Sequence, residues 1–277
     1  MSGKRRKIGI AVWLCIVLIL LAACILTAPS AGGEDSIKEV MRDAVLHEND
    51  KISLLGVIEV NPAVLSGLVV TGALLLLAAI LRIWAIPNFK YVPGRLQMLL
   101  EQAVDLFDSM AKANSPHRNA FLGAYIFGAG VYIFVGTLFE LLGIQAVTVQ
   151  GASVALPAPL SDINAAISLG CLSYLVILSG GVAQNGARGV GNTLKDFSLP
   201  ISMSFRLFGA LLSGLLVTEL VYYYVSLSFV LPVVVAVLFT LLHALIQTYV
   251  LTMLTALIYG EVSHPHAKKA KKRAAKV

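Results

Sequence analysis

The chain has 277 residues, of which 58% are apolar and only 13% are charged, whereas about 25% of the residues in a soluble domain are charged. This composition excludes an ordinary soluble domain and indicates an integral membrane protein. The net charge of +6 does not indicate a nucleic-acid partner, because basic residues gather at the chain ends, four in residues 4–7 and six in residues 268–276. Such clusters are typical of the flanks of membrane spans.

Six apolar runs are long enough to cross a bilayer, for which a helix needs about 20 residues. They cover residues 8–28, 63–86, 120–142, 161–181, 200–227 and 229–260. The last two runs exceed the length of a perpendicular crossing, so we expect a strongly tilted helical hairpin. The predicted fold is therefore an all-α integral membrane protein with five spans, this C-terminal hairpin included, behind an extra N-terminal span or signal segment.

The N-terminal segment, residues 1–28, has two interpretations. MSGKRRK, an apolar stretch and LAAC at residues 21–24 resemble a lipoprotein signal, whose cleavage would leave a lipid-carrying Cys24 at the N-terminus. The alternative is an uncleaved anchor in which Cys24 is a small apolar residue. We expect residues 29–62 to form an extracytoplasmic segment, residues 63–260 the membrane domain and residues 261–277 a basic cytoplasmic tail.

Charge in the connecting segments predicts the orientation of the spans, because cytoplasmic loops are enriched in Lys and Arg. Residues 29–62 carry three basic and seven acidic residues, whereas residues 87–118 carry four basic and three acidic ones. The segment 182–199 contains Arg188 and Lys195, and the tail contains six basic residues. We therefore expect segments 87–118 and 182–199 and both chain ends to be cytoplasmic.

Residues 93–112 are predicted to form an amphipathic helix rather than a span. Apolar residues recur there at helical spacing: Leu96, Leu99, Leu100, Ala103, Phe107 and Met110. Charged residues occupy the other faces of the same helix: Glu101, Asp105, Asp108 and Lys112. We expect this helix to lie on the inner surface of the membrane.

The last two apolar runs contain four polar residues that are costly inside a membrane: Arg206, Glu219, His243 and Gln247. A charge at mid-membrane costs about 2.5–3.5 kcal/mol, so such residues generally face a partner or a water-filled cavity. Arginine cannot avoid this cost by becoming neutral. Arg206 and Glu219 cannot pair within one continuous helix, because their separation corresponds to a rise of about 20 Å.

Small residues follow Arg206 along its helix. Gly209, Ala210, Ser213 and Gly214 thin the helix and allow another helix to approach its backbone closely. This pattern predicts that Arg206 meets a carboxylate carried by another chain.

Four motifs, in order along the chain, resemble subunit a of the F-type rotary ATP synthase. They are VPGRLQ at residues 92–97, LPAPLSDIN at 156–164, PISMSFRLFG at 200–209 and QTYVLTMLTALIY at 247–259. The resemblance covers nearly the whole chain after about residue 52. It implies a multi-pass stator subunit of the membrane Fo sector, located in the inner (plasma) membrane of a bacterium with its C-terminus in the cytoplasm.

In that family an arginine faces a rotating ring of small c subunits, each of which carries one membrane carboxylate. Carried onto this chain, the resemblance implies that Arg206 drives ion release from the arriving carboxylate, between two offset half-channels, and so couples ion flow to ATP synthesis. It implies the c-ring, the peripheral-stalk subunit b and the lipid bilayer as partners, with no nucleic acid and no cofactor. The driving ion, a proton or Na+, stays open, because selectivity lies largely in the ring.

The surroundings of Arg206 depart from the family pattern. Ala210 and Leu215 occupy positions where members commonly have Asn and Glu, and Thr240 occupies that of a polar partner seven residues before the family's glutamine. Glu219 and His243 lie about one turn from Leu215 and Thr240 on similar faces.

These displaced residues define the predicted ion path. The residues expected to take part in ion translocation are Arg206, Glu219, His243 and Gln247. Those expected to line the half-channels are Ser202, Asp162, Asn164 and Thr240. Because the two helices are antiparallel, the two displacements move Glu219 and His243 in opposite directions along the hairpin. We therefore expect water, rather than a direct bond, to connect these two residues.

Several other classes are disfavoured by the sequence. The chain has no phosphate-binding GxxxxGK[ST] loop, so we expect a non-catalytic subunit rather than an ATPase. SGG at residues 179–181 lacks the lysine of such a loop and is predicted to end a helix. The alternative function is a stand-alone polytopic secondary ion transporter, although such folds commonly contain repeated halves, and none is visible in this sequence.

Overall fold

The structure is a computed structural model that describes residues 15, 19, 51–54, 58–116, 119–149, 151, 153–223, 234 and 236–264. It is an all-α integral membrane protein. Five helical segments are long and apolar enough to cross a membrane: Pro62–Asn88, Ala120–Leu142, Ile163–Asn185, Ser198–Thr218 and Val237–Val262. These segments confirm the five predicted spans that follow residue 62.

Some sequence-based predictions concern residues that the structure does not describe. The proposed signal or anchor at residues 8–28 falls almost entirely outside the described part, and so does the basic tail after residue 264. The predicted turn between the last two helices also lies outside it. These predictions therefore stay predictions.

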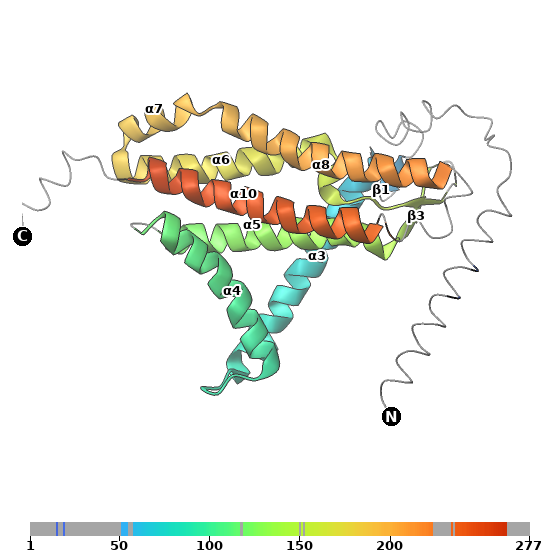
Figure 1. The fold of residues 1–277 in the computed structure, drawn as a ribbon, viewed down its shortest axis with the longest axis horizontal. Coiled ribbons are helices and arrows are strands. Elements are labelled where there is room, and N and C mark those ends of the chain that lie inside the picture. The colour runs from blue at the N-terminus through green and yellow to red at the C-terminus, as the bar shows by residue number, and fades with distance from the viewer. Residues whose placement is uncertain are drawn as a thin grey trace, which may run out of the picture.

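Four long helices form the main bundle (Figure 1). They are α5 (Ala120–Phe139), α6 (Ile163–Asn185), α8 (Ser198–Tyr223) and α10 (Leu241–Val262). Helix α10 packs against α5 and α6, and α8 packs mainly against α6. Buried aliphatic side chains such as Ile133, Ile177 and Leu207, each at most 1% exposed, fill the space between these helices.

Glycine sets the closest approach between α6 and α8. A Cβ atom added at Gly170 would clash with Ser204 Oγ and would lie 2.9 Å from the Pro200 carbonyl oxygen. The Ser204 hydroxyl already donates a hydrogen bond of 2.6 Å to that carbonyl. The absence of a side chain at Gly170 therefore allows α8 to lie directly against α6, as small residues do at helix contacts in membranes.

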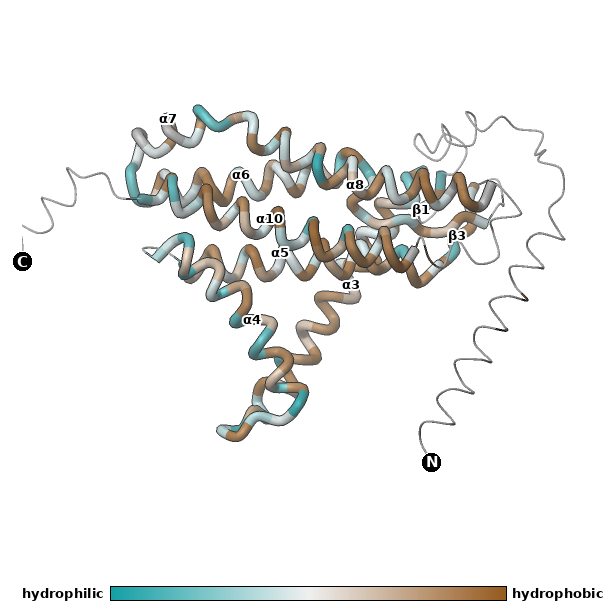
Figure 2. The backbone as a smooth tube through the Cα atoms, viewed as in Figure 1, coloured by the Kyte–Doolittle hydropathy of each residue, from teal (hydrophilic) through white to brown (hydrophobic). Residues whose placement is uncertain are grey.

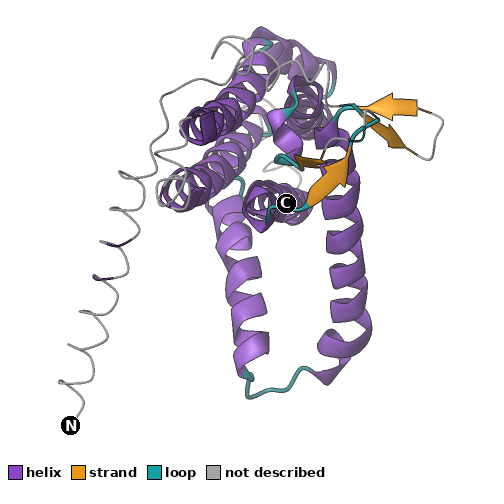
Figure 3. Ribbon diagram, turned by 90° about the vertical axis from the view of Figure 1, so that its right-hand side faces the viewer, coloured by secondary structure: helices purple, strands orange, loops and turns teal. Residues whose placement is uncertain are grey.

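Helices α3 and α4 leave the bundle and meet at a loop (Figures 1 and 3). Helix α3 (Pro62–Ile80) begins with an Asn61 side-chain cap and a proline in its first turn, both of which favour a helix start. It continues through a π-helical turn (Leu81–Ala85) and a 3-10 turn (Ile86–Asn88). Figure 2 shows α3 as strongly apolar and α4 (Arg95–Asn114) as mixed in hydropathy.

Helix α4 confirms the helix predicted over residues 93–112, with its bounds displaced by two residues. The C-terminal half of its apolar stripe packs on the bundle. Phe107 lies edge-on to Phe127, with ring centroids 5.7 Å apart, and lies where a Cβ atom at Gly130 would be. On the polar face, Lys112 pairs with Asp108 one turn earlier.

Two short antiparallel hairpins were not predicted. Strand β1 (Ile52–Leu54) pairs with β2 (Ile58–Val60), and β3 (Gln145–Val147) pairs with β4 (Ser153–Ala155). The Val149 amide donates to the Lys51 carbonyl at 3.0 Å, which joins the two regions. Each strand has three residues, too few for a period-two pattern to be recognised, and pairing satisfies the backbone groups of these loops.

The prediction that SGG at residues 179–181 ends a helix was wrong. Helix α6 continues to Asn185, and a short helix α7 (Ala187–Lys195) follows within the segment predicted to be a connection. Gly180 lies against the ring of Tyr259, and a Cβ at Gly181 would lie 2.5 Å from Val262 Cγ1. These glycines serve close packing of α6 on α10. The helix ends at Gly186, whose φ of 62° favours glycine.

Candidate functional site

Arg206 lies within the membrane span formed by α8, at the edge of the face that packs on the bundle. Met203 and Leu207, three residues before it and one after it, are 3% and 1% exposed. Arg206 itself is exposed, as is Phe205 at 59%. One face of α8 therefore binds α6, and the helix carries the guanidinium toward the uncovered side.

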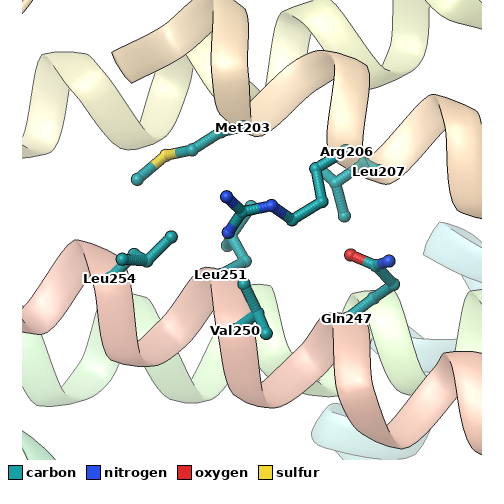
Figure 4. Close-up of a pocket in the computed structure, with 7 residues that line it drawn as sticks. All are labelled: Met203, Arg206, Leu207, Gln247, Val250, Leu251 and Leu254. Atoms are coloured by element: carbon teal, nitrogen blue, oxygen red, sulfur yellow. The ribbon is translucent and has the colours of Figure 1, made fainter.

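A small pocket between α8 and α10 contains this guanidinium (Figure 4). Its lining residues are Met203, Arg206, Leu207, Gln247, Val250, Leu251 and Leu254. In Figure 4 the side chains of Arg206 and Gln247 extend from opposite helices into the space between them. The structure thus brings together two of the four residues predicted for ion translocation.

Among the residues whose side chains the structure describes, none supplies a counter-charge to Arg206. Among the residues that the structure describes, no carboxylate or other hydrogen-bond acceptor contacts its guanidinium. Apolar side chains and the Gln247 amide form the lining of the pocket. An arginine in this setting keeps its charge, and five N–H donors are available to a planar acceptor that approaches from the exposed side.

His243 faces α8 one turn before Gln247. A Cβ atom at Gly214 would lie 3.9 Å from His243 Nδ1, and the His243 ring lies 5.9 Å from that of Phe239. His243 is thus level with Gly214, whereas Glu219 lies five residues further along α8, which corresponds to about 7.5 Å. Helix α8 is still continuous at Glu219, so this residue lies further along the helix axis than His243 does.

The other predicted lining residues lie in three places. Ser202 is exposed on α8 one turn before Arg206, and Thr240 is half-buried at the end of the π-helical turn Ala236–Thr240. Asp162 and Asn164 lie at the start of α6, where Asn164 is exposed. The structure does not bring Asp162 or Asn164 into the pocket that contains Arg206.

Asp162 joins the beginnings of α3 and α6. Its Oδ1 accepts hydrogen bonds from the backbone amides of Asn164 (2.6 Å) and Ala165 (3.3 Å), so it caps α6. Its Oδ2 accepts a bond of 2.7 Å from the Asn61 side chain, and Asn61 Oδ1 accepts from the Ala63 amide at the start of α3. The sequence did not identify Asn61, because its partner lies 101 residues away.

Replacement of Asp162 by alanine is expected to lower the stability of the purified chain by about 1–2 kcal/mol, because α6 loses its cap and the bond to Asn61 is lost. Asp162→Asn is expected to cost less, since an amide oxygen still accepts from the helix amides. Thermal unfolding in detergent measures both changes. Equal losses in the two variants would contradict the capping role.

The fold and the site define a class of protein. In the part of the chain that the structure describes, five apolar helices and an exposed arginine beside a glutamine, with no acceptor in contact, characterise a polytopic membrane protein. A family model described as ATP synthase A chain matches residues 66–259. The chain therefore belongs to the ATP synthase A chain family and is a subunit a of the F-type ATP synthase.

Proposed function

We propose that this chain is the ion-channel stator subunit of an F-type ATP synthase and that Arg206 exchanges ions with the carboxylates of a rotating c-ring. The observation that carries this proposal is the position of Arg206, exposed on α8 beside Gln247 with no acceptor among the described residues. A moving carboxylate from another chain supplies the missing counter-charge.

The chemistry follows from electrostatics. Opposite charges about 4 Å apart at an effective dielectric near 20 attract by about 4 kcal/mol, which corresponds to a fall of roughly three units in the pKa of the ring carboxylate. A carboxylate that arrives at Arg206 therefore releases its ion. The fixed positive charge also repels free cations. Ions therefore cross while bound to the carboxylates of the rotating ring, and not by direct passage past Arg206.

Two half-channels deliver and remove the ion. On the α8–α10 side, His243 and Gln247 lie on α10 and Thr240 lies at the end of the π-helical turn before it. Ser202 and Glu219 belong to α8. Asp162 and Asn164 lie at the start of α6, at the end of the bundle where the predicted outer entrance is. We expect water to connect Glu219 with His243, because His243 lies level with Gly214, five residues before Glu219 on α8.

Purification of the intact complex tests the assignment against a stand-alone transporter. A tagged chain in native membranes is expected to co-purify with a ring of small hairpin subunits and with the peripheral-stalk subunit b. The chain alone in vesicles is expected to transport no ion, because the carboxylate that carries the ion past Arg206 belongs to the ring. Ion transport by the isolated chain would support the transporter instead.

A sodium ionophore that stops ATP synthesis while the proton gradient persists would identify sodium as the driving ion.

A further inference from the structure

The loop between α3 and α4 forms a corner that the proposed ion path does not use. Residues 82–95 contain Arg82, Lys90 and Arg95 and no acidic residue, and all three basic side chains are exposed. Two aromatic side chains accompany them, Trp84 at 72% exposed and Tyr91 fully exposed. Trp and Tyr with Lys and Arg are the residues that proteins place at the level of lipid headgroups.

The Gln97 side chain holds this corner in shape. Its Oε1 accepts from the Lys90 amide and its Nε2 donates to the Lys90 carbonyl, both at 3.0 Å. Nε2 also donates to Glu101 at 2.8 Å. The backbone of Lys90 is therefore fixed against the first turn of α4, and Lys90 and Arg95 are presented together at the start of that helix.

Exposure on all sides of the C-terminal end of α3 favours lipid over a protein partner. Leu75, Leu76 and Leu77 are each more than half exposed, and successive residues of a helix point about 100° apart. A protein partner covers one side of a helix, whereas acyl chains surround it. Figures 1 and 3 show the lower parts of α3 and α4 diverging from the bundle, so the corner is open to its surroundings.

The apolar stripe of α4 continues to this corner. Phe107 and Met110 pack on the bundle, but Leu96 and Leu99 on the same stripe are exposed, and so is Leu106 at its edge. A headgroup layer at the level of Lys90 and Arg95 would place these leucines in the acyl region. The charge distribution of the connecting segments predicts that this is the cytoplasmic leaflet, where anionic lipids attract basic residues by about 1 kcal/mol each.

We propose that the α3–α4 corner, with Arg82, Lys90 and Arg95 beside Trp84 and Tyr91, is a binding site for anionic phospholipid headgroups, preformed by the Gln97 side chain. The site is independent of the role assigned to Arg206. It anchors the interfacial helix, and hence the cytoplasmic end of α5, at a defined depth in the bilayer.

Fluorescence of Trp84 tests this site in the full chain. The chain has two tryptophans, so Trp13→Phe leaves Trp84 as the single reporter. The variant is placed in nanodiscs that contain phosphatidylcholine and a minority of phosphatidylglycerol, and the brominated acyl chains are carried either by one lipid or by the other. At equal bromolipid fraction, brominated phosphatidylglycerol is expected to quench Trp84 more strongly. Equal quenching by the two lipids would overturn the proposal.

Charge and loop variants refine this test. Each replacement among Arg82→Gln, Lys90→Gln and Arg95→Gln is expected to lower the preference for phosphatidylglycerol by about fivefold, whereas Lys195→Gln, an exposed basic residue elsewhere, is expected to leave it unchanged. Gln97→Ala retains every basic residue and is expected to weaken the preference by freeing the loop. An equal effect of Lys195→Gln would show general attraction rather than a site.

A photoreactive residue at Tyr91 distinguishes lipid from protein in the assembled complex. After irradiation of native membranes, a phospholipid adduct at this position is expected, identified by mass and by its sensitivity to phospholipase. An adduct with another subunit in place of lipid would show that a protein covers the corner and would overturn the proposal.

Discussion

Replacement of Arg206 by alanine is expected to abolish ion-driven ATP synthesis in membrane vesicles. An interaction of about 4 kcal/mol with the ring carboxylate disappears, so that carboxylate keeps its ion, and the rate is expected to fall by roughly two to three orders of magnitude. The barrier to free cations disappears as well. Vesicles stripped of the catalytic sector are therefore expected to leak ions more rapidly in this variant.

Arg206→Lys tests whether any basic side chain is sufficient at this site or whether a guanidinium group is required. The ammonium group is a compact point charge that becomes neutral in a desolvated site, unlike a guanidinium. We expect this variant to assemble with the ring but to lose coupled synthesis. Lys195→Ala, which removes a basic residue just before α8, serves as the matched control and is expected to retain synthesis. Normal coupled synthesis by Arg206→Ala would reject the mechanism.

Replacement of Gly170 by valine is expected to displace α8 and to remove Arg206 from its working position. The new side chain would meet Ser204 Oγ and the Pro200 carbonyl oxygen, which lies only 2.9 Å from the Cβ position. Overpacking of this kind costs about 1–3 kcal/mol. Arg206 lies two residues beyond Ser204, so a shift of the α6–α8 contact moves the arginine as well. Both the thermal stability of the purified chain and coupled synthesis are expected to fall.

Gly128→Val is the matched control for this experiment. Gly128 lies on α5, and nothing lies within 4 Å of the position that a Cβ would take. The two variants add the same side chain at a membrane glycine, so a difference between them reports the close approach at Gly170. Similar stability and synthesis in both variants would show that this helix contact does not position Arg206.

Hydrophobic pattern was enough to predict the spans. A run of about 20 apolar residues requires a helix in a bilayer, because every backbone polar group must then be satisfied within the segment. The amphipathic helix was predicted for a related reason, since its apolar residues recur at helical spacing. Arg206 also stood out in the sequence, because the cost of a permanent charge depends on its apolar surroundings along the chain.

Other features depend on contacts between distant segments. The sequence led to the wrong prediction that Gly180 and Gly181 end a helix, because a glycine that ends a helix and one that packs it look alike until Tyr259 and Val262 lie beside them. It did not reveal the bond between Asn61 and Asp162, and it predicted Asp162 only as channel lining. Short strands and the nine-residue helix α7 carry too little periodicity to be recognised.

The sequence by itself predicted the five spans found after residue 62, the amphipathic helix beside them and the need of Arg206 for a partner, because each of these predictions depends on local polarity. The tertiary structure decided which side of α8 is covered, that Gln247 shares a pocket with Arg206 and that His243 lies level with Gly214. The physical reason is helix packing. The register between two helices depends on the positions at which small residues allow the two backbones to approach. It therefore depends on the residues of both helices and cannot be predicted from either helix alone.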